Sequence, residues 1–170
     1  FLYLGRINRD KGIIELVNAF KKIEYSLDVL LIIVGSIEDK KLNDLLKKNK
    51  KILYFNYTTK PEDWFSLADI LCLPSHREGF GTVVIEAASC GIPALCSNIY
   101  GLNDSIVKNK TGFFHTVKST DDIKKKMLYI INNQQLVKKY GISARKKVLR
   151  DFDQNHVTKN LLKFITSNIC

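Results

Sequence analysis

The sequence predicts an α/β domain built on a doubly wound parallel sheet. Six short runs of apolar and β-branched residues alternate with longer helical patterns, and the alternation is uninterrupted up to about residue 131. Strand, helix and strand in series imply parallel strands joined by right-handed crossovers. The chain has 170 residues, of which 45% are hydrophobic, a length and composition that suit one compact core.

The expected strands are short and mostly aliphatic, and they lie at about 1–4, 28–34, 52–56, 70–73, 93–97 and 112–115. Between them, apolar residues recur at three-to-four spacing, as in Ile13, Leu16, Val17 and Phe20. From about residue 134 the pattern is helical only. We therefore expect one domain over 1–170, with an α/β core over about 1–150 and an amphipathic C-terminal helix over about 153–168.

The net charge of +10 is unevenly distributed along the chain. Residues 1–60 carry +5, residues 61–107 carry −5 and residues 108–170 carry +10, and the lysine-rich segment 40–51 is expected to be a helix and its exit. Solvated helix faces, an anionic membrane surface and nucleic acid are the three interpretations. No aromatic residues interleave with the lysines and there is no zinc-finger spacing, so nucleic acid is disfavoured.

The longest uncharged apolar run, Val29–Val34, is far shorter than the roughly 20 residues that span a bilayer, so no transmembrane helix is expected. The cysteines form no CxxC pair and are interpreted as small buried hydrophobic side chains in a reducing compartment, the cytoplasm; they are Cys72, Cys90, Cys96 and Cys170. A Cys90–Cys96 disulfide is the alternative that spacing allows, but a helix end entering a strand would separate the two residues.

The loop from Gly5 to Gly12 follows the first expected strand and precedes the first helix. Arg6 and Lys11 beside a helix N-terminus would suit a diphosphate, with arginine as a fork and lysine as a point charge. The loop has neither the P-loop order nor G-x-G-x-x-G, and an exposed basic turn is the alternative.

The segment from Pro74 to Ala87 is the most specific stretch of the chain. Gly79 and Gly81 permit close backbone approach to a ligand, and the first amides of the following helix are free to bind an anion. Glu78 lies in the loop and Glu86 lies about one turn into an otherwise apolar helix, where burial would be expensive. Helix capping or pairing with lysine would explain a single glutamate. Two glutamates on either side of Gly-Phe-Gly instead favour binding of vicinal hydroxyls.

Glu78-Gly79-Phe80-Gly81, with Glu86 and the run Ala87–Pro93, resembles the E-G-F-G…E-A-x-x-C-G-x-P-V segment of retaining GT-B glycosyltransferases of the glycogen-synthase-like family 4 type. Other landmarks of the family occur in the same order, at Gly5-Arg6, Lys11-Gly12, Ile33-Val34-Gly35, Leu67-Ala68-Asp69-Ile70 and Thr111-Gly112-Phe113. The family's G-L-P-E becomes Gly101-Leu102-Asn103-Asp104, which keeps a carboxylate and loses the proline.

The resemblance implies that this chain is the C-terminal, donor-binding half of a GT-B enzyme, and that a separate N-terminal Rossmann-like domain, absent here, binds the acceptor. Arg6 and Lys11 would hold the donor diphosphate, Glu78 would face the transferred sugar, and these three are the expected catalytic residues. Glu86 would accept hydrogen bonds from the ribose hydroxyls. The base would lie near Asn56 and Tyr57, where the family has glycine and asparagine tolerates a left-handed backbone. The expected donor-binding set is Gly5, Arg6, Lys11, Asn56, Tyr57, Glu78, Gly79, Phe80, Gly81, Thr82, Val83 and Glu86.

The expected reaction transfers a sugar from a nucleotide-diphosphate donor to a glycan or lipid-linked acceptor with retention, in cell-surface polysaccharide synthesis. Fixed cations and amides aimed at the departing diphosphate would lower the barrier without a metal or other cofactor. Asp151-Phe152-Asp153 is a D-x-D motif that we interpret as a turn with helix capping, not a metal site. His76, which borders the Glu78 loop, His115 and His156 have no zinc-ligand spacing.

Two other classes of function stay open at this stage. A sugar epimerase or phosphorylase could share the fold, although no lysine signals a pyridoxal phosphate pocket. A non-catalytic nucleotide or nucleic-acid module is the other. The expected location is cytoplasmic, with the basic helices allowing a peripheral position at the inner face of a membrane.

Overall fold

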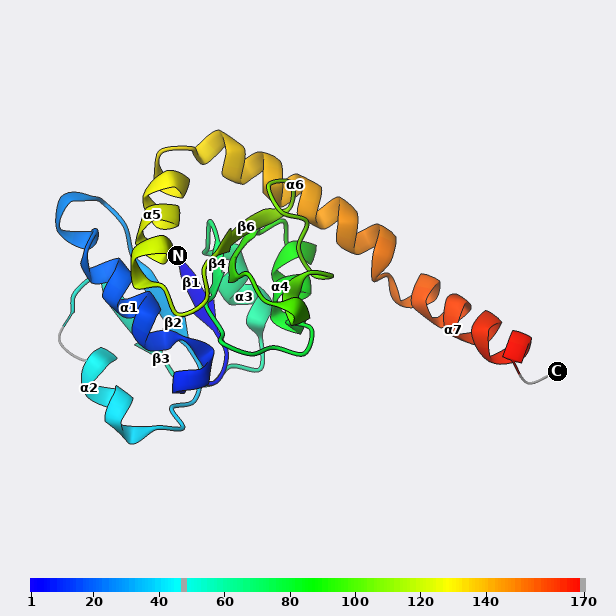
Figure 1. Cartoon of the computed structure of the whole chain (residues 1–170), viewed down its shortest axis with the longest axis horizontal. Helices are drawn as coiled ribbons and strands as arrows, with labels where there is room; N and C mark the ends of the chain where they lie inside the picture. The colour runs from blue at the N-terminus through cyan, green and yellow to red at the C-terminus, as the bar shows by residue number, and fades with distance from the viewer. Residues whose placement is uncertain (47–48, 169–170) are drawn as a thin grey trace.

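The computed structural model describes residues 1–46 and 49–168 and contains a six-stranded sheet (Figure 1). All neighbouring strands are parallel, in the order β3-β2-β1-β4-β5-β6. The strands are β1 (Leu2–Leu4), β2 (Leu31–Val34), β3 (Ile52–Phe55), β4 (Leu71–Leu73), β5 (Ala94–Ser97) and β6 (Gly112–His115). Each lies inside the range expected from the sequence, and the doubly wound α/β fold is confirmed.

The strand order reverses between β1 and β4, which lie side by side at the centre of the sheet. From β1 the chain winds outward through β2 to β3, then returns to β4 and winds outward the other way. In such a sheet the loops at the carboxyl ends of the two central strands diverge and leave a crevice. The loops after β1 and β4, which the sequence singled out, are the two that flank this crevice.

Helices cover both faces of the sheet. They are α1 (Ile13–Lys21), α2 (Asn43–Leu46), α3 (Pro61–Ser66), α4 (Thr82–Ser89), α5 (Thr120–Ile131), α6 (Gln134–Asp151) and α7 (Gln154–Asn168). The core of one face joins the apolar sides of α1, α2 and α5, and the core of the other joins those of α3 and α4. Adjacent strand residues serve opposite cores, Leu2 one and Tyr3 the other, because side chains alternate along a strand. Helix α6 packs on α4 through Ala88, Ala144 and Val148.

The lysine-rich segment is less helical than its pattern indicated. It forms a 3-10 turn over Lys40–Leu42 and one short helix, α2, while Lys47 and Lys48 lie outside the described residues. Asn49 then folds back, donating to the Glu24 carboxylate and accepting from the Lys51 amide at 2.8 Å. The bond from the Lys51 amide to the Asn49 side chain competes with a continued helix.

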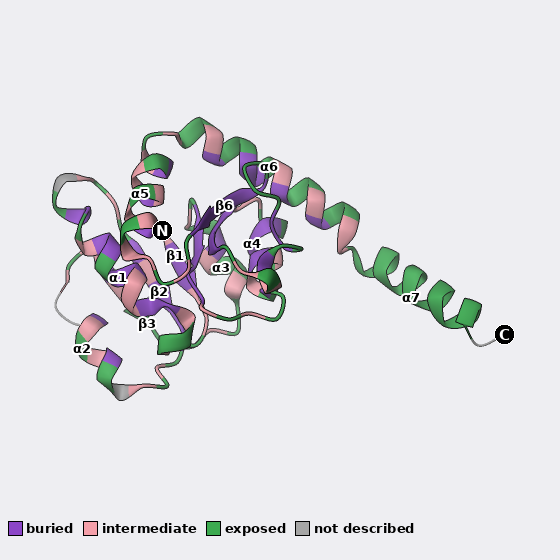
Figure 2. Cartoon of the chain, in the orientation of Figure 1, coloured by how far each residue is buried: buried purple, intermediate pink, exposed green. Residues whose placement is uncertain are grey.

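Helix α7 extends away from the rest of the chain and has no buried residue (Figures 1 and 2). Its apolar side chains are exposed, including Val157, Leu161, Phe164 and Ile165. The amphipathic C-terminal helix is thus confirmed, and its apolar stripe is uncovered in the described chain. None of the helices described in the structure is long and apolar enough to cross a bilayer.

His115 ends β6 in a buried position and supplies a pH-dependent term to stability. Its Nδ1 lies 2.9 Å from the Thr116 carbonyl oxygen, while its buried Nε2 has no partner among the described residues. Burial lowers the pKa of His115 below the ordinary 6.5. The unfolded chain therefore takes up this proton at higher pH than the native chain does, and acid favours unfolding.

We expect the free energy of unfolding to fall as the pH drops below about 6.5, and to fall less steeply in His115→Gln. Urea midpoints measured from about pH 7 to pH 5 test this expectation. His156→Gln is the matched control, because His156 is exposed on α7. Parallel pH profiles for the native chain and His115→Gln would contradict it.

Candidate functional site

The loops that follow β1 and β4 meet at the carboxyl edge of the sheet. Gly12 ends the first loop with φ of 67°, and a Cβ there would lie 2.0 Å from the Pro74 carbonyl oxygen. The His76 amide donates to the Asp10 carbonyl oxygen at 2.7 Å. Glycine is needed at position 12 both for its left-handed backbone and for the approach of the second loop.

Three consecutive residues of the second loop contact charged residues that follow β1. The contacts are His76 Nε2 to Glu15 Oε1 at 3.2 Å, Arg77 to Asp10 at 2.5 Å, and Glu78 to Lys11 at 2.5 Å. Arg77 and Asp10 are exposed, and the hydrogen bond from Arg77 lowers the pKa of Asp10. Together with the backbone bond, these contacts fix the two loops as one unit.

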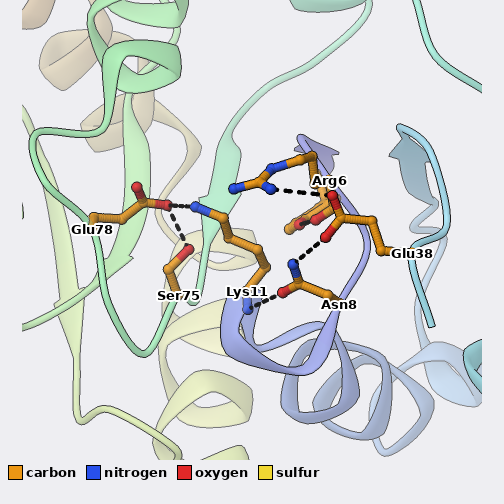
Figure 3. A network of polar contacts seen from close by, with 7 residues as sticks. Arg6, Asn8, Lys11, Glu38, Ser75 and Glu78 are labelled. Atoms are coloured by element: carbon orange, nitrogen blue, oxygen red, sulfur yellow. Dashed lines mark hydrogen bonds and ion pairs between the residues drawn. The ribbon is translucent and has the colours of Figure 1, made fainter.

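The pair formed by Lys11 and Glu78 lies at the centre of this unit. The two side chains are only 19% and 13% exposed, and Ser75 Oγ also donates to Glu78 at 2.9 Å (Figure 3). Solvent screens such a pair much less than a surface pair. The structure thus brings together two of the three expected catalytic residues.

Arg6, the third, belongs to the same network but is more exposed. Its guanidinium donates to Glu38 at 3.1 Å, and Asn8 Nδ2 donates to the other Glu38 oxygen at 2.7 Å (Figure 3). Asn8 Oδ1 accepts from the Lys11 amide at 3.0 Å. These bonds, that of Asn8 above all, lower the pKa of Glu38. The 66% exposure of Arg6 leaves its remaining donors open to a ligand.

Buried Tyr3 contacts the loop after β1 from the core of the domain. Its hydroxyl donates to the Arg6 carbonyl oxygen at 2.5 Å. Burial, and then the charge of Glu78, raises the pKa of Tyr3 far above its ordinary value, so the hydroxyl keeps its proton. The backbone of Arg6 is therefore held in place from the core of the domain.

Helix α4 begins at this edge with an unsatisfied N-terminus. Gly81 is its N-cap with φ of 73°, and no side chain caps it. Within the described residues, the amides of Thr82 and Val83 have no acceptor. Such amides, with the positive end of the helix dipole, bind anions. Phe80 is partly exposed, and its ring lies 5.5 Å from that of Phe152 at the end of α6.

Glu86 lies one helical turn beyond Thr82 on α4, and both residues are exposed. The buried residues of the helix are Val84, Ala87 and Ala88. Glu86 is not buried, because it lies on the solvent side of an amphipathic helix. The expected cost of burying its carboxylate therefore does not arise. Its carboxylate contacts no donor in the part of the chain that the structure describes, so it is available to a ligand.

Asn56 and Tyr57 follow β3 at the same edge of the sheet but outside this network. Both are exposed, and the Asn56 side chain accepts from the Tyr57 amide at 2.8 Å. Asn56 does not adopt the left-handed backbone that asparagine tolerates, since the non-glycine residues with positive φ in the described chain are Asn109 and Lys118. The structure does not bring these two residues into contact with Arg6, Lys11 or Glu78.

The segment Gly101–Asp104 lies against the Glu78 loop. A Cβ at Gly101 would be 1.8 Å from the Glu78 carbonyl oxygen, so glycine allows the two backbones to touch. The segment forms a 3-10 turn over Tyr100–Leu102. Although the proline of the family pattern is absent, this segment still lies next to the site.

The residues that sequence reasoning missed are Tyr3, Asn8, Glu38 and Ser75. Asn8 had a readable signal, because asparagine before Arg-Asp-Lys-Gly is a favoured helix cap. Glu38 follows β2 at the same edge as Arg6, which its position in the strand order could have indicated. Tyr3 and Ser75 each bond to a residue three positions further along the chain, Arg6 and Glu78, but neither contact follows a motif that marks it in the sequence.

The D-x-D motif acts in helix termination. Asp151 ends α6 and pairs with Arg150 at 2.5 Å, which lowers the pKa of Asp151 to about 2. Asp153 accepts from the amides of Asn155 and His156 at the start of α7. The capping interpretation is confirmed. Over residues 1–46 and 49–168, no three His, Cys, Asp or Glu side chains are grouped to hold a metal.

Cys72, Cys90 and Cys96 are free thiols, and the Cys90–Cys96 disulfide is not formed. The expected burial is confirmed for Cys72 and Cys96 and is wrong for Cys90, which is exposed because it lies at the C-terminal end of α4. Cys170 lies outside the described residues. Burial raises the pKa of the Cys72 thiol to about 12 and that of Cys96 well above its ordinary value.

Solved structures share this architecture. A glycosyltransferase from Rickettsia africae ESF-5 superposes with a TM-score of 0.88 at 25% identity, covering 96% of this chain and 46% of that one. Anabaena Alr3699/HepE, crystallised with UDP, superposes with a TM-score of 0.90 at 18% identity, covering 98% of this chain and 48% of that one.

Sequence comparison gives the family. The capsular polysaccharide biosynthesis glycosyltransferase CapM of Staphylococcus aureus is 32% identical over 165 residues, which is 94% of this chain and 43% of that protein. The chain thus spans less than half the length of each of these three proteins. Residues 1–147 match the family model described as Glycosyl transferases group 1. The chain belongs to this family of glycosyl transferases.

Proposed function

We propose that the chain is the donor-binding half of a retaining glycosyltransferase that uses a nucleotide-diphosphate sugar. The observation that carries the proposal is the convergence, at the switch point of the sheet, of Arg6, Lys11 and the uncapped N-terminus of α4 around Glu78. Cations and free amides suit a diphosphate, and carboxylates suit sugar hydroxyls.

The diphosphate is the leaving group, and this edge is arranged to stabilise its charge. As the glycosidic bond to the donor breaks, positive charge builds at the anomeric carbon and negative charge on the diphosphate. Fixed cations and amides lower that barrier without reorganising. Arg6 and Lys11, with the amides of Thr82 and Val83, supply these groups, so the reaction we propose uses neither a metal nor another cofactor.

The two glutamates have different tasks in this proposal. Glu78, which Ser75 and Lys11 hold in place, faces the transferred sugar. Glu86 has a free, exposed carboxylate and accepts hydrogen bonds from the ribose hydroxyls. Asn56 and Tyr57 lie apart from the network and border the base of the nucleotide. The shape of the surrounding surface then determines which base is bound.

The acceptor lies on the portion that the longer relatives have beyond this chain. We propose an N-terminal acceptor domain there, and a glycan or lipid-linked acceptor in cell-surface polysaccharide synthesis. The relationship to CapM, a capsular polysaccharide glycosyltransferase, supports the acceptor class, and UDP in the HepE structure supports a nucleotide donor. The free thiols Cys72, Cys90 and Cys96 support a cytoplasmic location.

Calorimetric titration of the chain with UDP, GDP, ADP and CMP tests the proposal. We expect saturable binding of one nucleoside diphosphate, weakened about tenfold or more in Glu86→Ala, because hydrogen bonds to a charged group are lost. The 2′-deoxy form of that nucleotide should bind the native chain more weakly, and the difference should shrink in Glu86→Ala. Glu62→Ala is the control, since Glu62 is exposed on α3.

Absence of binding by all four nucleotides to the folded chain would contradict the proposal, as would equal losses in Glu86→Ala and Glu62→Ala. Binding that weakens steeply with salt and ignores Glu86 would instead favour a nucleic-acid module. Retention is tested separately, from the anomeric configuration of the product made by the full-length enzyme.

A further inference from the structure

Helix α6 has one face in the core and one face in solvent. Its buried residues recur at helical spacing and pack on α4 and the β6 edge; they are Val137, Tyr140, Gly141, Ala144 and Val148. The opposite side is exposed along the helix (Figure 2), and beyond the first turn its exposed residues are Lys138, Lys139, Ile142, Arg145, Lys146, Leu149 and Arg150. We name these seven residues the outward face of α6.

The outward face is strongly basic and contains no carboxylate. Of its five cations, Arg150 pairs with Asp151. The other four, Lys138, Lys139, Arg145 and Lys146, have no ion-pair partner among the residues that the structure describes. Lys110 extends the charge, because it borders the same hollow as Lys139 and Lys146. Uncompensated positive charge over one surface indicates an anionic partner.

Two aliphatic side chains lie among these cations. Ile142 and Leu149 are two turns apart on the same side of α6, and each is 60% exposed. They line a shallow hollow with Lys138, Arg145 and Lys146. A helix that presents aliphatic residues surrounded by lysine and arginine is typical of binding in the plane of a membrane interface.

We propose that the outward face of α6 docks on a bilayer surface rich in anionic lipid. There the aliphatic tips of Ile142 and Leu149 enter the boundary between headgroups and acyl chains, while the cations extend to the lipid phosphates. A nucleic acid would also complement the positive charge, but it would place its phosphates against the aliphatic side chains of Ile142 and Leu149. We therefore favour a lipid surface as the partner. The proposal does not depend on the proposed enzymatic function.

Helix α6 also contacts the candidate site, through Lys147, which is not part of the outward face. Lys147 Nζ lies 4.4 Å from the centre of the Phe152 ring, and that ring contacts Phe80 of the Gly-Phe-Gly loop. Lys147 also donates to the Asp104 carbonyl oxygen at 2.7 Å, in the segment beside Glu78. These contacts connect α6 directly to the segments that border the candidate site.

Flotation of the chain with lipid vesicles tests the proposal. The probes are phosphatidylcholine vesicles with and without about one third phosphatidylglycerol, at about 0.05 M salt. We expect the native chain to bind the anionic vesicles only. Replacing Lys138, Lys139, Arg145 and Lys146 by glutamine should lower the partition coefficient about 100-fold or more, and Ile142→Ser with Leu149→Ser should lower it about tenfold.

The matched control replaces Lys41, Lys50, Lys60 and Lys125, four exposed lysines on other surfaces, by glutamine. It removes the same charge and should retain most of the binding, and circular dichroism should show that all variants keep the native helix content. Helix α7 is unchanged in every variant, so any contribution from its apolar residues cancels. The proposal is overturned if the native chain ignores anionic vesicles, or binds neutral ones equally. Equal losses in the two lysine sets would also overturn it, as would binding of RNA or DNA in place of lipid.

Discussion

Alanine at Gly12 is expected to lower the free energy of unfolding by about 3 kcal/mol or more. Two effects combine at this position. The backbone is left-handed, with φ of 67°, and the added Cβ would lie 2.0 Å from the carbonyl oxygen of Pro74. The obstacle is backbone of the neighbouring loop, so relief requires the loops after β1 and β4 to separate. Urea denaturation of the variant and the native chain measures the loss.

Two other glycines separate these effects. Gly91 has φ of 81° but open space around its Cβ position, so Gly91→Ala reports strain alone and should cost about 1 kcal/mol. Gly79 has neither a positive φ nor a nearby atom, so Gly79→Ala should change stability by less than about 1 kcal/mol. If Gly12→Ala were no worse than Gly91→Ala, the close approach of the two loops would be refuted.

Methionine at Lys11 is expected to weaken nucleoside diphosphate binding about 100-fold. The variant removes a charge-assisted contact to the phosphates, and it leaves the mostly buried Glu78 carboxylate without its cation. That unpaired negative charge would then repel the diphosphate. The double variant Lys11→Met with Glu78→Gln removes this repulsion, so it should bind more tightly than Lys11→Met alone.

Lys22→Met is the control for this experiment, because Lys22 forms an exposed ion pair with Asp121 on a different surface. Its affinity should match that of the native chain. Calorimetry with the nucleotide that the native chain binds gives all four values. A double variant that binds no better than Lys11→Met would show that the diphosphate does not lie beside Glu78.

The sequence predicted the framework well because the framework depends on local patterns. Each strand lies in a short apolar run that ends at a polar residue, glycine or proline, and such runs mark buried parallel strands. The loops after β1 and β4 could be found because each combines charged residues with glycine directly after a strand. This composition is typical of a sharp backbone turn or of a ligand site; the charged residues are Arg6, Lys11 and Glu78. The pairing of Lys11 with Glu78 was beyond a sequence pattern, since 67 residues separate them.

What the sequence could not supply are side-chain roles that depend on tertiary distance. Glu38 joins the site through a contact with Arg6, which lies 32 residues earlier in the chain, and no local spacing records that contact. Glu86 was misjudged because the helix around it reads as apolar, whereas only one side of α4 faces the core. The pattern of the lysine-rich segment indicated a longer helix because its charges are compatible with one. Instead, the Asn49 side chain donates to Glu24 and accepts from the Lys51 amide.

Amide chemical-shift mapping of the chain with the bound nucleoside diphosphate tests most directly that the switch point of the sheet holds the donor. We predict the largest shifts at the amides of Gly79 to Val83 and in the loop from Arg6 to Lys11, with smaller ones near Asn56 and Tyr57. Shifts confined to α6, α7 or the amino-terminal edge of the sheet would contradict this assignment, even if the affinity were high.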